Sequence, residues 1–464
     1  MKYFYAKLSV IGVVLLMLLA SCGQEVSVPG AIADGAGLPA APEAYYYEAG
    51  AQNELIADVT LMPEGVFDFP SLHIQSELCP FDIERELWHD GYLTIEGTTE
   101  HFLLTDTPVR LRGRGNSTWI RGPEKRPLRI RFAEAQYFLD SPYPARDWIL
   151  LANHFDMSLL RNYAAFYLAS MLEGMDWTPF TRIVHLYVNG EYRGVYQLTD
   201  ERDVGVGRAD LTFDPDPTLS EYFFELDGHM VGWLADGNVE NVDFFVAHDR
   251  AYDIRFPSRS DRGGHLEYLK DYVIRVGEAA MTHSYSEISA LVDIDSLVDF
   301  YIVQELFKNI DVGNFSVFMQ IRGQGENRRL YFGPVWDFDR SAGNTLYWTE
   351  YANLFAVIYN EWFNGFFSAP EIYERRLSRW NELIVGPIPQ LLDRLVHLQE
   401  HYSDALLRNF VPHYNLFEGE PEWFDMIPEA TREIKSHSGQ LEYLIEWLSS
   451  RANWLDDYFN RRIE

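Results

Sequence analysis

Short runs in which apolar and polar residues alternate dominate the chain from about residue 55 to 132. Alternation with a period of two is typical of half-buried β-strands, and four such runs lie at 72–74, 92–95, 109–112 and 128–132. Two further runs, at 184–188 and 192–198, are joined by Asn189-Gly190, a pair that favours a type I′ turn. The pattern predicts a β-rich region that includes a hairpin.

Helical spacing of apolar residues begins after these strands and dominates the second half of the chain. Residues 156–172 and 297–309 predict helices, the first with Asp156 as its N-cap. Two strands are expected at 315–321 and 329–332, joined by a Gly-Gln-Gly turn at 323–325. The rest of the chain, 370–464, predicts helices that proline interrupts at Pro387, Pro389, Pro412 and Pro428. We therefore expect an α+β protein with a β-rich lobe over 51–210 and a mainly helical lobe over 211–464.

A short apolar run at the N-terminus predicts export. Residues 8–20 follow Lys2 and Lys7 and are too few to cross a bilayer. The next residues, Leu19-Ala20-Ser21-Cys22, resemble a bacterial lipobox, which implies cleavage before Cys22 and lipidation of its thiol; a plain signal peptide is the alternative. We expect a lipoprotein signal peptide at 1–22, a flexible tether rich in Gly, Ala and Pro at 23–50, and an extracytoplasmic protein held to a bacterial membrane by lipid.

Composition excludes several classes of protein. The chain carries 70 acidic and 38 basic residues, a formal net charge of −32, so its bulk charge repels nucleic acid. A hydrophobic fraction of 47% excludes a disordered chain. The two cysteines, Cys22 and Cys79, are too few for a disulfide scaffold or a four-cysteine zinc site.

One stretch reverses the sign of the charge. Between Arg110 and Arg131 there are eight cations and one acid within 22 residues. Strand alternation places Arg110, Arg112 and Arg114 on one face, and the glycines in the loop at 113–118 let backbone N–H groups approach an anion. The stretch predicts a site for a polyanion such as a triphosphate, although pairing with surface carboxylates is the alternative.

A second group of residues is acidic. Asp311 and Asn314 follow a predicted helix, and Asp337 and Asp339 follow the second strand of the 315–332 pair. Kinase-like folds present a base, a metal-binding amide and a metal-binding carboxylate in this order. Magnesium prefers oxygen ligands and is commonly held by one or two carboxylates together with phosphate oxygens. Solvated acids are the alternative in a chain with 70 carboxylates.

Several motifs follow one another along the chain. They are Arg112-Gly113-Arg114-Gly115-Asn116-Ser117-Thr118-Trp119, Lys125-Arg126-Pro127-Leu128-Arg129, the segments 147–153, 160–162 and 189–196, and Pro334-Val335-Trp336-Asp337-Phe338-Asp339. Together they resemble the CotH-type spore-coat protein kinases, in the family's order from about residue 70 to 345. The resemblance implies an atypical kinase-like fold of two lobes that binds ATP with Mg²⁺, or with Mn²⁺ in its place, and phosphorylates protein hydroxyl groups.

The resemblance also implies roles for individual residues. Lys125 matches the family's phosphate-contacting lysine, Asp311 the catalytic aspartate and Asp337 the metal aspartate. Asp200 stands where the family usually has glutamate and is expected near the ribose, whereas the acidic partner of Lys125 and the roles of Arg161 and Asn162 stay open. The expected nucleotide-binding set is Arg112, Arg114, Asn116, Ser117, Thr118, Lys125 and Asp200, and the expected metal set is Asp337, Asn314 and Asp339.

The expected location supports a second hypothesis. A lipoprotein outside the cytoplasm meets little ATP, so a catalytically weak, kinase-like module that binds partners at the cell surface is the alternative to an enzyme. A glycoside hydrolase has no support beyond the abundance of acids. For an enzyme, the charge of the whole chain suggests a protein acceptor rich in basic residues.

Overall fold

The computed structural model describes residues 61–62, 66–77, 83–122, 124–229, 244–346, 350–413, 417 and 426–461. The predicted signal peptide with Cys22, the predicted tether and Cys79 lie outside the described residues. Of the described helices, none has both the length and the apolar character needed to cross a membrane.

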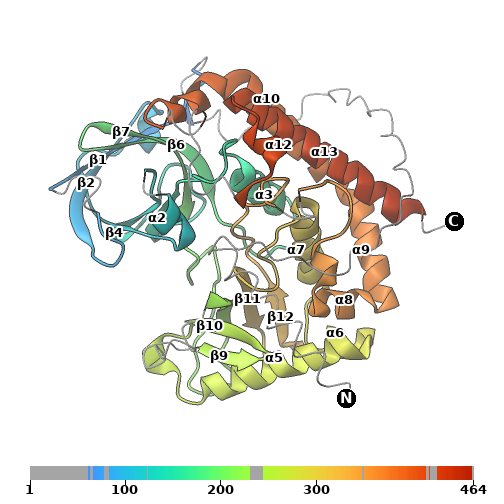
Figure 1. Cartoon of the computed structure of the whole chain (residues 1–464). Coiled ribbons are helices and arrows are strands. Elements are labelled where there is room, and N and C mark those ends of the chain that lie inside the picture. The colour runs from blue at the N-terminus through green and yellow to red at the C-terminus, as the bar shows by residue number, and fades with distance from the viewer. Residues whose placement is uncertain are drawn as a thin grey trace, which may run out of the picture. The chain divides into compact units, whose positions relative to one another are not determined.

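The β-rich part of the chain forms a closed barrel with strand order β1-β2-β3-β4-β5-β7-β6 (Figure 1). Its neighbouring strands are antiparallel, except that β1 and β6 are parallel. Asn189 and Gly190 have φ of +52° and +81°, as a type I′ turn requires, which confirms the predicted hairpin. The strands are β1 (Ser71–Ser76), β2 (His89–Glu96), β3 (Thr107–Gly113), β4 (Leu128–Gln136), β5 (Ala145–Leu151), β6 (Thr181–Val188) and β7 (Glu191–Asp200).

A second sheet has the order β12-β11-β8-β10-β9. The predicted strand pair at 315–332 is confirmed as β11 and β12, whereas β8, β9 and β10 were not predicted. The five residues of β8 are all buried, Glu225 among them, so the strand lacks the alternation of apolar and polar residues that identifies a half-buried strand. The strands are β8 (Tyr222–Leu226), β9 (Phe244–Ala247), β10 (Arg250–Phe256), β11 (Val317–Arg322) and β12 (Arg329–Phe332).

Helices pack around α7 (Ile294–Phe307), which is buried along most of its length. It contacts α3, α9, α13 and β12 and ends at the loop that carries Asp311. Figure 1 shows α10 and α13 running side by side, and the two helices are in contact. The other helices are α2 (Ser117–Arg121), α3 (Arg161–Ser170), α5 (His265–Thr282), α6 (Tyr285–Ser289), α8 (Glu361–Phe367), α9 (Pro370–Leu383), α10 (Pro387–Leu407), α12 (Glu429–Arg432) and α13 (His437–Arg461).

Two local predictions about helix ends are wrong. Helix α3 begins at Arg161 rather than at residue 156, and its N-cap is Leu160. Asp156 nevertheless accepts the backbone N–H of Arg161 at 2.8 Å, so it stabilises the start of the helix from outside it. Pro389 does not interrupt a helix, because α10 begins at Pro387 and the first turn of a helix does not need its N–H groups for intrahelical bonds.

Candidate functional site

Asp337 follows β12 in a backbone conformation that few residues other than glycine adopt, with φ of +68°. Its Oδ2 accepts a hydrogen bond from Ser316 Oγ at 3.2 Å, and its carbonyl oxygen accepts one from Asn309 Nδ2 at 3.2 Å. The next residue, Phe338, donates its backbone N–H to Asn162 Oδ1 at 2.6 Å. The segment is therefore held from α3, from β11 and from the end of α7.

The structure brings Asp311 and Asp339 together with Asp337. Asn309 joins two of the segments, because its Oδ1 accepts the N–H of Asp311 while its Nδ2 donates to Asp337. Burial raises the pKa of Asp311 to about 7, and repulsion from Asp337 contributes to the increase. Burial also raises the pKa of Asp339 well above its ordinary value, again with a contribution from Asp337. The predicted base and two predicted metal ligands thus form one cluster, which we call the carboxylate cluster.

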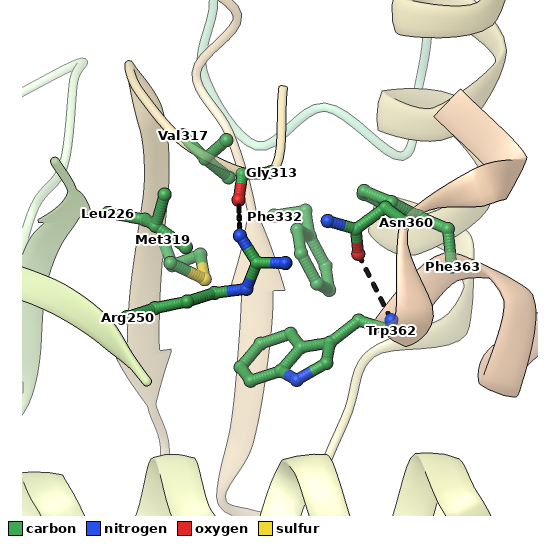
Figure 2. A pocket seen from close by; sticks show the side chains of 9 residues that line it. All are labelled: Leu226, Arg250, Gly313, Val317, Met319, Phe332, Asn360, Trp362 and Phe363. Atoms are coloured by element: carbon green, nitrogen blue, oxygen red, sulfur yellow. Dashed lines mark hydrogen bonds between the residues drawn. The ribbon is translucent and has the colours of Figure 1, made fainter. Parts of the chain in front are cut away.

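Asn314, a predicted metal ligand, is engaged by other protein groups. Its Oδ1 accepts a hydrogen bond from Arg250 at 3.1 Å, and its carbonyl oxygen accepts the N–H of Gly228 at 2.7 Å. Arg250 also donates to the carbonyl oxygen of Gly313 inside a pocket lined by apolar side chains such as Phe332 (Figure 2). These contacts fix the position of the loop that carries Asp311.

Arg114 reaches the carboxylate cluster from the barrel. Its guanidinium lies 5.8 Å from the ring centre of Trp336, the residue before Asp337. Burial lowers the pKa of Arg114 to about 10, and nearby Arg202 lowers it further, whereas Glu201 and Asp337 oppose the change. Arg114 makes no side-chain hydrogen bond or ion pair with another residue that the structure describes. A half-buried guanidinium without a side-chain hydrogen bond or ion pair is suited to binding an anion.

Glu201, which the sequence analysis did not select, links the arginines to one another. It forms ion pairs with Arg129 at 3.1 Å and with Arg202 at 3.3 Å. Burial opposes its ionisation, but the surrounding arginines lower its pKa to about 2. Arg202 in turn lies 4.2 Å from the ring centre of Trp336. The sequence analysis selected the adjacent Asp200, and no local pattern distinguishes Glu201 from the other acidic residues of the chain.

Trp88 is a further residue that the sequence analysis missed. It lies at the centre of the cationic face, by which we mean the surface formed by Arg110, Arg112, Arg129 and Arg131. The guanidinium groups of Arg112 and Arg131 are 4.9 and 4.3 Å from its ring centre, and those of Arg110 and Arg129 are 5.8 and 5.7 Å away. Facing pairs across β3 and β4 place these arginines together. The predicted alternation of these strands is therefore confirmed.

Lys125 lies elsewhere. The structure buries it completely, and its Nζ donates to the carbonyl oxygens of Ala152 at 2.6 Å and Val195 at 2.5 Å. Burial lowers its pKa well below the ordinary value, and Asp156 is the acid that opposes this change. No hydrogen bond or ion pair between Lys125 and the carboxylate cluster occurs among the described residues. Its predicted contact with phosphate stays a prediction, while its observed contacts join the segment before β4 to β5 and β7.

The other predicted nucleotide-binding residues are distributed over two places. Asn116 and Ser117 are exposed and Thr118 is half-buried, at the start of the short helix α2 two residues after Arg114. Asp200 is fully buried at the end of β7, where it accepts the N–H of Phe180 at 2.7 Å. Burial raises the pKa of Asp200 to about 7. Its predicted role near a ribose stays a prediction.

Arg161 and Asn162, whose roles the sequence left open, hold the carboxylate cluster in place. The buried Arg161 donates through Nε to the carbonyl oxygen of Ser341 at 3.0 Å and forms an ion pair with Asp156. Asn162 donates to Asn153 Oδ1 at 2.9 Å and accepts the N–H of Phe338. The hydrogen bonds to Ser341 and Phe338 connect the first turn of α3 to the segment that contains Asp337.

The donor set fits a divalent cation. Asp337 and Asp339 offer carboxylate oxygens; burial raises the pKa of Asp339, repulsion from Asp337 raises it further, and a bound cation would relieve that repulsion. Among the described residues there is no group of three or more His, Cys, Asp or Glu side chains arranged to hold a metal ion. The pair therefore suits an ion such as Mg²⁺ that also takes oxygen ligands from a phosphate.

The structure is thus an α+β protein in which Arg114, directly after β3 of the closed barrel, lies within electrostatic range of Asp337 in the carboxylate cluster. The particular family follows from comparison with known families: the chain belongs to the CotH kinase protein family, whose pattern it matches over residues 110–455. This span contains the arginines of the cationic face and the whole carboxylate cluster, whereas Trp88 precedes it. No curated protein matches the chain.

Proposed function

We propose that the protein transfers the γ-phosphoryl group of ATP to hydroxyl groups of proteins. The observation that carries the proposal is the position of Arg114, whose guanidinium has no hydrogen-bonding partner among the described residues and interacts electrostatically with Asp337. Phosphoryl transfer depends mainly on positioning and on cations that stabilise the charge of the transferred group. Membership of the family supports the same reaction class.

The geometry suggests a role for each group. Arg114 and Arg202 bind phosphate oxygens, and Glu201 orients Arg202 through its ion pair. Asp311 accepts the proton of the acceptor hydroxyl; a pKa of about 7 is near the optimum for a general base at neutral pH. Asp337 and Asp339 would hold Mg²⁺, which supplies neutralising charge at the phosphates. The same residues could serve Mn²⁺.

The most direct test compares purified mature chain with its Asp337→Asn variant. We expect the wild type to transfer phosphate from radiolabelled ATP to protein of its own membrane fraction, and Asp337→Asn to reduce the rate at least 100-fold. Asparagine tolerates the positive φ at this position, so the fold should survive. Asp106→Asn is the matched control, because Asp106 also has a positive φ (+44°) but is exposed on the barrel. Equal rates for wild type and Asp337→Asn would contradict the proposal.

The placement of Lys125 favours a second candidate function. Its ammonium group is bound by two backbone carbonyls, so a catalytically weak module that binds partners at the cell surface is the alternative. Such a module would show stabilisation by nucleotide without a phosphoprotein product.

We also propose that the chain acts outside the cytoplasm through a lipid anchor at Cys22; mass spectrometry of the N-terminal peptide would test this. The acceptor protein that we expect is rich in basic residues.

A further inference from the structure

His229 lies beside the carboxylate cluster and is not used by the proposed mechanism. Its Nδ1 forms a hydrogen bond with Asp227 Oδ1 at 2.8 Å, and its ring centre is 4.5 Å from that of Phe315. No contact of its Nε2 occurs among the described residues, and about half of the side chain is exposed. The ring is thus fixed in orientation while one nitrogen stays accessible.

The backbone fixes this ring relative to the loop of Asp311. The N–H of Gly228 donates to the carbonyl oxygen of Asn314 at 2.7 Å, which ties the segment of His229 directly to that loop. A side chain at Gly228 would come within 2.9 Å of both that oxygen and the ring of Phe315, so the two segments approach as closely as a glycine permits. His229 therefore keeps its place relative to Asp311.

The electrostatic surroundings favour the protonated imidazole. The hydrogen bond with Asp227 raises the pKa of His229 above its ordinary value, against the effect of partial burial. Asp311 and Asp337 raise it further. A protonated His229 therefore carries an Nε2–H donor within electrostatic range of Asp311 and Asp337.

We propose that His229 is a further catalytic residue, whose Nε2–H donates a hydrogen bond to a non-bridging oxygen of the phosphoryl group during transfer. The inference rests on the proposed function. In the step, the acceptor oxygen forms a bond to the γ-phosphorus, the bond from that phosphorus to the β,γ-bridging oxygen breaks, and its electron pair leaves with ADP. The hydroxyl proton passes to Asp311, and His229 keeps its proton throughout. Asp227 is a positioning residue that fixes the imidazole.

The test is chemical rescue of a His229→Ala variant of the full mature chain. We expect turnover to fall about 100-fold, as on loss of one donor to a developing charge, with the stabilisation by Mg·ATP unchanged. Added imidazole should raise the rate of the variant at least tenfold, because the exposed position leaves room for it. If His229 had only a structural role, imidazole would not change the rate. The turnover of His229→Gln, which supplies a neutral donor, should lie between that of the wild type and that of His229→Ala. The matched control is His73→Ala, since His73 also stacks on an aromatic ring at 4.5 Å and pairs with a carboxylate, but on β1 of the barrel.

The outcomes separate the inference from the function on which it rests. Transfer by the wild type together with an unimpaired His229→Ala would overturn the inference alone. An impaired variant that imidazole does not restore would also overturn it. If the wild type binds Mg·ATP but transfers no phosphate, the proposed function fails before His229 is tested.

Discussion

At the scale of single residues, two cations from one charged stretch have opposite surroundings. Lys125 is fully buried with two carbonyl partners, whereas the side chain of Arg114 has no hydrogen-bonding partner among the described residues and is attracted by Asp337. Buried polar groups that are fully satisfied contribute to stability, and a desolvated cation without a partner is available to a ligand. This contrast yields a prediction that separates the two residues.

We expect Lys125→Met to reduce stability and Arg114→Gln to reduce nucleotide affinity. Loss of the Lys125 ammonium leaves two buried carbonyls unpaired and should lower the free energy of unfolding by about 2–4 kcal/mol, with a nearly unchanged dissociation constant for Mg·ATP. Arg114→Gln should raise that constant about tenfold, the cost of one charge-assisted hydrogen bond, and barely change the melting temperature. Denaturant unfolding and calorimetric titration measure the two effects. A stable Lys125→Met protein that no longer binds nucleotide would instead support the contact that the family resemblance implies.

At the scale of elements, α3 couples the barrel to the carboxylate cluster. Asn162, in the first turn of α3, connects Asn153 after β5 to the N–H of Phe338 beside Asp337. Because Asp337 has a positive φ, its segment needs such external contacts to keep its conformation. The start of α3 is therefore part of the support of the site.

Asn162→Ala should consequently impair both stability and transfer. The unpaired N–H of Phe338 should lower the free energy of unfolding by about 1–3 kcal/mol. Because Asp337 is then held less firmly, turnover should fall more than tenfold at equal amounts of folded protein. Asn460→Ala is the control, since Asn460 is exposed on α13 and bonds to Asp456 in the preceding turn. Melting curves and initial rates report the two effects. Full activity in Asn162→Ala would show that α3 does not position the cluster.

Sequence patterns predicted those elements whose periodicity is local. Strand β3, which carries Arg110 and Arg112, alternates clearly, and the turn at Asn189-Gly190 depends on two adjacent residues, so both were predicted. Strand β8 was missed because burial on both faces removes the alternation. Glu201 and Trp88 were missed because their importance comes from partners on other strands, which no local pattern records.

At the scale of the whole molecule, two sets of carboxyl groups set the dependence of stability on pH. Asp200 and Asp311 have pKa values raised to about 7, so the stability that their protonated forms contribute is lost as pH rises from about 4 through 7. Glu201 and Asp68 have pKa values lowered to about 2, so their contribution is lost as pH falls below about 4.5. The net charge of −32 adds self-repulsion at high pH. Stability should therefore be greatest near pH 4, where the two windows meet.

Magnesium should reduce the loss of stability above that pH. Binding to Asp337 and Asp339 requires ionised carboxylates, so we expect Mg²⁺ at about 100 times its dissociation constant to add about 2.7 kcal/mol at pH 8 and much less at pH 5. Thermal unfolding of the unlabelled protein without nucleotide measures this gain in stability directly. The Asp337→Asn variant should lose the gain, whereas the control variant Asp106→Asn should keep it. Calcium at the same concentration tests whether the gain reflects general screening of charge. An equal gain in Asp337→Asn would place the ion elsewhere on the acidic surface and would remove the cation from the proposed site.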